Sequence, residues 1–220
     1  FIRNENSVEE WMLKAREMRA NAQFGVQAIN NPKSFNPINI GPGINSNHAE
    51  YFPCLTVDGK TMLFTRYLPI KNKSLSQEDF FVSESNENQN WGVAEPMQKN
   101  VNTINNEGAP TISSDGKSLI FVACCDESGD YGYGRAGLGS CDLFYTKKLG
   151  NNWLTPINLP GNVNSRNWET QPSLSADGKT LYFIRGVRSK EGKRESDIYV
   201  SRLENDGKWS AAERLPNTIN

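Results

Sequence analysis

The sequence has few of the residues on which several enzyme classes depend. Its 220 residues include one histidine, His48, and four cysteines. These numbers are too small for a His-rich zinc site or a disulfide-built scaffold. Neither Gly-x-Ser-x-Gly nor His-Glu-x-x-His occurs, so these serine hydrolase and zinc protease signatures are missing. We expect no catalytic residue, cofactor or metal ligand, although a pair of hydrolytic carboxylates stays open because such pairs have no fixed spacing.

The sequence also lacks an excess of charge of one sign, and it has no long apolar run. The 24 Lys and Arg residues nearly balance 25 Asp and Glu residues, for a net charge of −1. This balance argues against nucleic-acid binding and against charge-driven attachment to a membrane surface. The longest apolar run, residues 119–125, is far too short to cross a bilayer. We predict no nucleic-acid partner and no transmembrane segment.

The first thirty residues have the pattern of an amphipathic helix. Apolar residues recur at steps of three and four from Val8 to Ile29, which places them on one helical stripe. Ser7 and Glu10 fit a capping box, and Pro32 ends the pattern. We predict an N-terminal domain over residues 1–33 that contains one helix, either a plain amphipathic helix or the end of a tetratricopeptide region.

From residue 34 onward the sequence repeats itself. Residues 37–64 and 156–183 are identical at 13 of 28 positions without a gap. The pattern Glu-x-x-Pro-x-Leu/Ile-Ser/Thr-x-Asp-Gly-Lys-Ser/Thr occurs three times, beginning at Glu50, Glu107 and Glu169. Each copy continues with two apolar strand-like segments and then a tryptophan, which is Trp91, Trp153 or Trp209.

Each copy predicts four short strands. The proline opens the first strand, Asp-Gly forms a tight hairpin turn, and the tryptophan opens the outer strand. One such sheet cannot bury both of its faces, so the copies must stack like the blades of a β-propeller. We predict a mainly β fold in which residues 34–220 form a partial propeller with four-stranded blades at about 46–105, 106–164 and 165–220. Residues 35–40 are interpreted as a fourth-strand segment that completes the last blade or remains an open edge.

The repeated acidic residues have structural and functional interpretations. Asp58, Asp115 and Asp177 precede glycine, where aspartate typically bonds to its own turn, although three of them could also form a metal or catalytic ring. The repeated glutamates precede the innermost strand. We expect their carboxylates to accept backbone amides from the adjoining loop, and the alternative is an acidic channel mouth that binds a cation.

The loop between the two central strands of the middle copy carries further signals. Cys124 and Cys141 flank it at the end of one strand and the start of its neighbour, which suits a disulfide in an oxidising compartment. The spacing Gly132-x-Gly134-x-x-Gly137 matches a dinucleotide fingerprint by letter, but no helix follows to receive a pyrophosphate. Acidic residues at 126, 127 and 130 leave calcium binding as an alternative.

A basic loop follows the second strand of the last copy. It contains five cationic residues, which are Arg185, Arg188, Lys190, Lys193 and Arg194. These residues could bind an anionic glycan, lipid or protein, and the alternative is a solvated loop.

The blade motifs resemble those of a known family. Residues 172–183 and 196–201, together with the junction formed by residues 35–41 and 50–53, resemble the WD40-like, TolB-type propeller repeats of Bacteroidota envelope proteins. The resemblance also implies the pairing of Cys124 with Cys141. Their usual layout is a lipoprotein signal, tetratricopeptide helices, a propeller and an OmpA-like peptidoglycan-binding domain, and some relatives belong to type IX secretion and gliding machinery.

The resemblance implies a non-enzymatic interaction scaffold of the bacterial cell envelope. We expect a periplasmic location, associated with the outer membrane through a lipid anchor on a segment upstream of Phe1. The expected partners are other envelope proteins, and also peptidoglycan through a domain outside these residues. Two alternatives are a propeller that gates a hydrolase domain encoded downstream, and a glycan-binding or glycan-cleaving propeller.

Overall fold

A computed structural model describes residues 5–70, 76–88, 90–188, 192 and 194–220, without the side chains of residues 5–7, 188 and 194. The chain divides into two compact units, residues 1–39 and 40–220. The boundary between these compact units falls after Asn39.

The first unit contains helix α1 (Glu5–Asn30). Its apolar side chains are exposed, including Trp11, Met18 and Phe24. The capping box predicted at Ser7 is wrong, because Ser7 lies within the helix rather than before it. At the other end, both the backbone and side-chain amides of Asn31 donate to the carbonyl oxygen of Gln27. Within the described residues, no helix combines the length and apolarity needed to cross a membrane.

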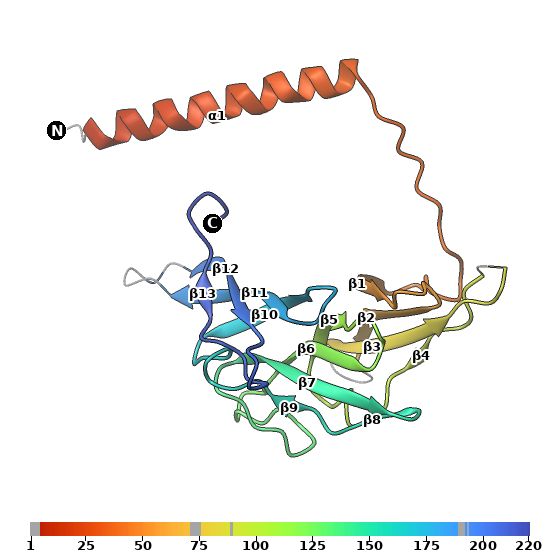
Figure 1. Ribbon diagram of the computed structural model, residues 1–220. Coiled ribbons are helices and arrows are strands. Elements are labelled where there is room, and N and C mark those ends of the chain that lie inside the picture. Colours follow the sequence, from red (N-terminus) through yellow and green to blue (C-terminus); the bar gives the residue numbers. More distant parts are fainter. Residues whose placement is uncertain (1–4, 71–75, 89, 189–191, 193) are drawn as a thin grey trace. The chain divides into compact units, whose positions relative to one another are not determined.

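The second unit consists of three antiparallel sheets (Figure 1). The first sheet contains β1 (Ala49–Leu55), β2 (Thr61–Pro69), β3 (Ser76–Glu84) and β4 (Glu95–Pro96) in that order. The second contains β5 (Glu107–Ile112), β6 (Ser118–Cys124), β7 (Cys141–Leu149), β8 (Asn152–Trp153) and β9 (Ile157–Asn158). The third contains β10 (Trp168–Leu174), β11 (Thr180–Arg188), β12 (Arg194–Arg202) and β13 (Glu213–Arg214).

The three sheets share one plan. In each of them three long strands follow one another in sequence order, and a short outer strand pairs with the third. In the second sheet the outer element is split, because β8 and β9 both pair with β7. Trp91 and Trp209 make isolated bridges at the places that correspond to β8. The predicted mainly β fold of repeated blade-like sheets after one helix is confirmed.

A β-bulge interrupts the first strand of every sheet. Pairing shifts between Tyr51 and Cys54 in β1, and at the corresponding places in β5 and β10. The residue just before each proline takes a positive φ of about 50°, namely Phe52, Ala109 and Gln171. Each proline therefore lies in mid-strand, where the bulge needs no ladder donor. The prediction that proline opens the strand was wrong because the bulge lets pairing begin several residues earlier.

Apolar contacts between neighbouring sheets form the core. Leu63 and Phe80 of the first sheet pack with Leu119, Phe121 and Phe144 of the second. A second cluster joins the other face of the second sheet to the third, and contains Ile120, Val122, Leu143, Leu181 and Phe183. Figure 1 shows the second sheet between the other two. Strand β6 is consequently buried on both faces from Leu119 to Ala123, whereas β11 alternates buried Leu181 and Phe183 with exposed Tyr182.

An asparagine side chain closes each sheet against its third strand. In the second sheet, Asn164 accepts a hydrogen bond from the Leu143 amide at 2.9 Å and donates one to the Leu143 carbonyl at 2.9 Å. Asn102 makes the same two bonds to Phe80, and Asn220 makes them to Ile198. We call these three side chains the asparagine clasps. Each clasp gives a third-strand amide its acceptor. It also adds a second donor to the carbonyl of the same residue, which already accepts the backbone amide of Met97, Leu159 or Leu215.

A fourth turn of the same kind precedes the first sheet. The amides of Ile44 and Asn45 donate to the Gly41 carbonyl, as the amides of Val163 and Asn164 donate to that of Pro160. The turn is hydrogen-bonded to the first sheet's outer segment, because the Ala94 amide donates to the Gly43 carbonyl. Among the described residues, however, no third strand receives the Asn45 side chain, which is exposed. Residues 35–40 lie outside any strand, and Phe35 and Ile38 are exposed. Their interpretation as a fourth-strand segment is therefore not confirmed.

We expect Asn164→Ala to lower the free energy of unfolding by about 1–3 kcal/mol, because it leaves the buried Leu143 amide without an acceptor, while the Leu143 carbonyl keeps the Leu159 amide. Asn45→Ala is the matched control and should change stability by less than about 0.5 kcal/mol. Urea unfolding followed by tryptophan fluorescence measures both variants. Equal losses of stability in the two variants would contradict the clasp interpretation.

Candidate functional site

The repeated glutamates lie at the entrance to the first strand of each sheet. Glu107 and Glu169 are fully buried, and each accepts a backbone amide and a hydroxyl from the residue four positions earlier. In the first sheet Glu50 accepts the same two bonds from Ser46. The carboxylates thus bond to the adjoining loop, as the structural interpretation expected, and the described contacts form no acidic channel mouth.

An arginine completes each of these entrances. Arg66 of β2 and Arg185 of β11 lie directly opposite Glu50 and Glu169 in the strand ladder, and each bonds to its partner through Nε, at 2.9 and 2.7 Å. Arg66 also lies over the ring of Phe81 at 4.2 Å, and Arg185 lies over that of Tyr199 at 4.6 Å. Each arginine therefore fixes the loop, the first strand and the aromatic face of the sheet together.

In the second sheet the glutamate is also paired with an arginine, but this arginine does not come from the neighbouring strand. The residue opposite Glu107 is Ala123, and the cation comes instead from Arg135 in the loop between β6 and β7. Arg135 is buried, pairs with Glu107, donates to the Tyr131 carbonyl at 2.9 Å and lies 5.3 Å from the ring of Phe144. Burial raises the pKa of the Glu107 carboxyl to about 7, while Arg135 and Thr103 favour its ionised form.

This loop is packed rather than solvated. Tyr131 is buried against Phe144, and its hydroxyl donates to the Gly139 carbonyl at 2.8 Å. A Cβ at Gly137 would overlap the Tyr131 ring, so glycine is required there by close packing. The Gly132-x-Gly134-x-x-Gly137 spacing thus serves a turn and a tyrosine contact. The Asp126 carboxylate accepts the amides of Ser128 and Asp130 within its own turn.

The disulfide predicted between Cys124 and Cys141 is present. Cys124 and Cys141 are paired across β6 and β7 and form a disulfide that closes the loop. Cys54 and Cys125 are free and half-buried. Burial raises the pKa of the Cys54 thiol to about 12, so this thiol is a poor nucleophile at neutral pH.

The repeated aspartates and tryptophans also have structural partners. Each of Asp58, Asp115 and Asp177 accepts a hydroxyl and a backbone amide within its Asp-Gly turn, and these bonds lower the pKa of each carboxyl. The metal or catalytic ring that was the alternative for them is not formed, since each aspartate is engaged in its own turn. The Trp153 and Trp209 carbonyls accept side-chain amides of Asn100 and Asn162 from the preceding sheet. Trp91 packs on the outer face of the first sheet.

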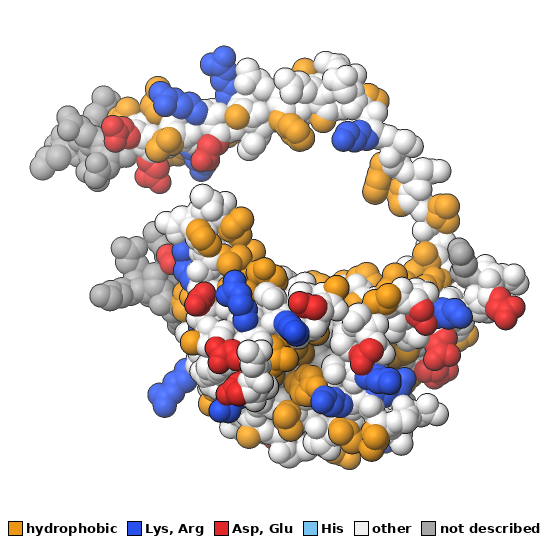
Figure 2. Space-filling model, in the orientation of Figure 1, with side chains coloured by type: hydrophobic (Ala, Val, Ile, Leu, Met, Phe, Trp, Pro, Cys, Tyr) orange, Lys and Arg blue, Asp and Glu red, His pale blue; other side chains and the backbone are white. Residues whose placement is uncertain are grey.

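The candidate anion-binding loop is only partly described. Arg185 is engaged with Glu169 and with the Val163 carbonyl at 2.6 Å, so its guanidinium is not directed to an external anion. The side chains of Arg188, Lys190, Lys193 and Arg194 lie outside the described residues. On the face seen in Figure 2, cationic and anionic side chains are interspersed among apolar ones.

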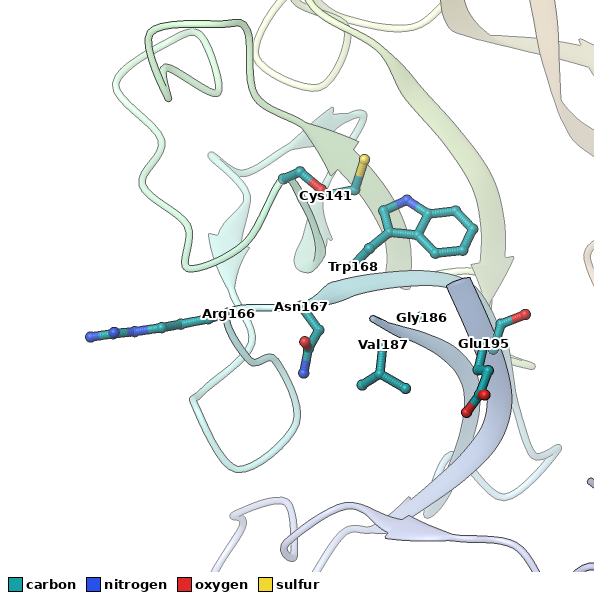
Figure 3. A pocket seen from close by; sticks show the side chains of 9 residues that line it. Cys141, Arg166, Asn167, Trp168, Gly186, Val187 and Glu195 are labelled. Carbon is teal, nitrogen blue, oxygen red and sulfur yellow. The ribbon is translucent and has the colours of Figure 1, made fainter. Parts of the chain in front are cut away.

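A pocket of about 700 Å³ lies between the start of β7 and the third sheet (Figure 3). Its lining comprises Ser140, Cys141, Arg166, Asn167, Trp168, Gly186, Val187, Glu195 and Ser196. Trp168 and Gly186 are directly paired in the β10–β11 ladder, and a Cβ at Gly186 would lie 2.7 Å from Cε3 of the indole. The ring therefore lies on the Gly186 backbone, and 40% of the residue is exposed.

Few of the described lining residues are acidic. Glu195 supplies the single carboxylate among the lining residues, whereas acid-pair hydrolysis of glycosides needs two carboxylates facing each other. Sequence reasoning missed this pocket, because Trp168 corresponds to Ala49 and Asn106 in the other copies and so carries no repeat signal. The one signal for the pocket in the sequence was an aromatic residue, Trp168, placed opposite a glycine, Gly186, in the predicted hairpin.

No family model and no curated protein matches the sequence. Among solved structures, BT0996 in its RGII complex is 13% identical, with a TM-score of 0.48 over 77% of this chain and 57% of that one. A glycoside hydrolase is 12% identical with a TM-score of 0.46, over 84% of this chain and 59% of that one. The tricorn protease is 10% identical with a TM-score of 0.43, over 74% and 18%. This chain thus spans less than two thirds of each of them, and these likenesses assign no activity to it.

We expect Arg135→Ala to lower the free energy of unfolding by about 3–5 kcal/mol, because it leaves the Glu107 carboxylate buried without its cation. Arg166→Ala removes an exposed arginine of the same unit and should stay within about 0.5 kcal/mol of wild type. Chemical denaturation measures both. A loss below about 1 kcal/mol for Arg135→Ala would show that the loop arginine does not replace the strand arginines.

Loss of the disulfide should lower stability by about 3 kcal/mol, since it closes a loop between residues 17 apart. We expect reductant to lower the unfolding midpoint of the wild type to that of the Cys124→Ser/Cys141→Ser variant and to leave the variant unchanged. A wild type whose unfolding midpoint is insensitive to reductant would refute the pairing.

Proposed function

We propose that this chain is a non-enzymatic interaction scaffold of the bacterial cell envelope. The observation that carries the proposal is the engagement of the repeated charged side chains. The glutamates bond to arginines and entrance loops, and the Asp-Gly aspartates bond to their own turns. These groups make the unit rigid and are not directed to a substrate. A rigid set of sheets that carries loops is a common platform for binding partners.

The surface of the third sheet supports an interaction role. Tyr182 and Ile219 are 40% and 61% exposed. The residues that correspond to them in the second sheet, Ile120 and Val163, are buried against a neighbouring sheet. The third sheet therefore presents apolar side chains at positions that the other sheets use for contact.

The proposed compartment is the periplasm, at the outer membrane. The Cys124–Cys141 disulfide supports an oxidising compartment. The resemblance of the blade motifs to envelope propellers supports the same assignment. The proposed partners are other envelope proteins, and peptidoglycan is reached through a domain beyond these residues.

Site-specific photo-crosslinking tests the scaffold role. A photoreactive phenylalanine analogue at Tyr182 should trap a defined envelope protein in intact cells, and the same analogue at Leu149, which is 71% exposed on the second sheet, is the matched control. We expect a discrete product at residue 182 alone. Products formed only with cytoplasmic proteins, or equally at both positions, would contradict the proposal.

The non-enzymatic part has its own test. We expect the purified chain to release no nitrophenol or nitroaniline above background from p-nitrophenyl esters, p-nitrophenyl glycosides or peptide p-nitroanilides. Glu195→Gln is the control for trace contamination, because a contaminating enzyme would be unaffected by it. Turnover that disappears in Glu195→Gln would show that the chain is an enzyme.

A further inference from the structure

The pocket around Trp168 carries an inference beyond the scaffold role. We propose that this pocket binds a neutral oligosaccharide, with the indole of Trp168 as the surface on which a sugar ring stacks. The argument rests on the support of the indole, the chemistry of the groups around it and the rigidity of the pocket wall.

The indole is supported from one side by Gly186, and 40% of the residue is exposed. Gly186 lies directly across the ladder from Trp168, and any larger residue there would displace the ring, because its Cβ would lie 2.7 Å from Cε3. Figure 3 shows the indole between Cys141 and the strands that carry Val187 and Glu195. An aromatic ring held flat with 40% of its residue exposed is a ready surface for a flat apolar ligand face.

The groups around the indole have the hydrogen-bonding character that sugar hydroxyls need. Glu195 accepts hydrogen bonds, Asn167 both donates and accepts, and the hydroxyls of Ser140 and Ser196 do both. A sugar ring has apolar C–H faces and a rim of hydroxyls that donate and accept. One aromatic surface surrounded by such groups matches that combination, and the volume of about 700 Å³ is in the range of small-ligand sites.

The described lining carries one charge of each sign, and the placement of these two charges favours a neutral sugar over an acidic one. Glu195 stands at the pocket wall, whereas the side chain of Arg166 extends away from the other lining residues (Figure 3). A carboxylated sugar would place its anion near Glu195 without a described cation directed toward it. The like charges would oppose binding.

The wall of the pocket is fixed before any ligand arrives. A Cβ at Gly139 would overlap the carbonyl oxygen of Asn167, so the disulfide-closed loop of the second sheet lies against the strand entrance that carries Trp168. Asp142 strengthens this loop by accepting the amides of Leu138 and Gly139 at 2.6 and 3.0 Å. A preorganised wall reduces the entropy lost on binding.

The test is a titration of the whole chain with cellobiose, maltose and N,N′-diacetylchitobiose, with digalacturonate as the acidic comparator. The readout is the indole N–H resonance of Trp168 in ¹H–¹⁵N spectra, assigned by its disappearance in Trp168→Phe. We expect at least one neutral disaccharide to shift this resonance saturably, and digalacturonate to bind more weakly.

Four variants separate stacking from a general loss of structure. Trp168→Ala should weaken binding by about tenfold or more, as for a central aromatic contact, and Gly186→Ala should weaken it by displacing the ring. Trp168→Phe should retain most of the affinity, which keeps the test informative if Trp168→Ala unfolds. Tyr182→Ala removes an equally exposed aromatic of the same sheet that lies outside the pocket lining, and should bind like wild type. Saturation-transfer signals from the ligand report affinity in variants without the indole.

Three results would overturn the proposal. These are the absence of any shift with all three neutral sugars up to their solubility limits, undiminished binding to folded Trp168→Ala, and tighter binding of digalacturonate than of every neutral sugar. Selective binding of an unstructured tetrapeptide pool at Trp168 would replace the saccharide with a peptide. Photo-crosslinking at residue 182 reports the scaffold role separately, so that either proposal can fail alone.

Discussion

The fold depends on covering apolar residues on both faces of a four-stranded sheet. Such a sheet is not stable alone, because half of its apolar side chains would remain in water. In this protein the second sheet has both faces covered, by the first sheet through Leu63 and Phe80 and by the third through Leu181 and Phe183. The buried run from Leu119 to Ala123 in β6 is the direct result. Stacking also places the loops of one sheet against the strand entrances of the next, where the candidate pocket lies.

Polar side chains then fix the geometry that stacking permits. The side chains of Asn102, Asn164 and Asn220 accept third-strand amides that the short outer strands do not reach. The arginine–glutamate pairs hold the entrances. That Arg135 arrives from a loop, where Arg66 and Arg185 arrive from a strand, shows that the position of the guanidinium matters more than its origin in the sequence. The repeated glutamates are thus engaged with arginines and entrance loops.

Much of the fold could be predicted from sequence because its signals are local. The Asp-Gly turns at Asp58, Asp115 and Asp177 and the spacing of the copies fix the hairpins within a few residues of each motif. The disulfide was readable because Cys124 and Cys141 flank one hairpin loop. The bulge before each proline was missed, because proline is common both at strand starts and at bulges.

The candidate site was much less predictable, because it depends on contacts between distant residues. Nothing near Arg135 in the sequence indicates Glu107, because the two residues lie 28 positions apart and the ladder partner of Glu107 is Ala123. The clasp of Asn164 on Leu143 joins residues 21 apart and cannot be told from an ordinary turn asparagine. Trp168 departs from the repeat, so reasoning from the shared pattern passes over it. Departures from a repeat are therefore where function is best sought in such a chain.

The most direct test of mutual support between the sheets is amide hydrogen exchange of the native chain. If stacking is the source of stability, the amides of Ile120, Phe121 and Leu143 should exchange slowest and only through global unfolding. Those of Tyr182 and Ile184, whose sheet has one covered face, should exchange measurably faster. Equal protection in β6 and β11, or slower exchange in β11, would contradict the account.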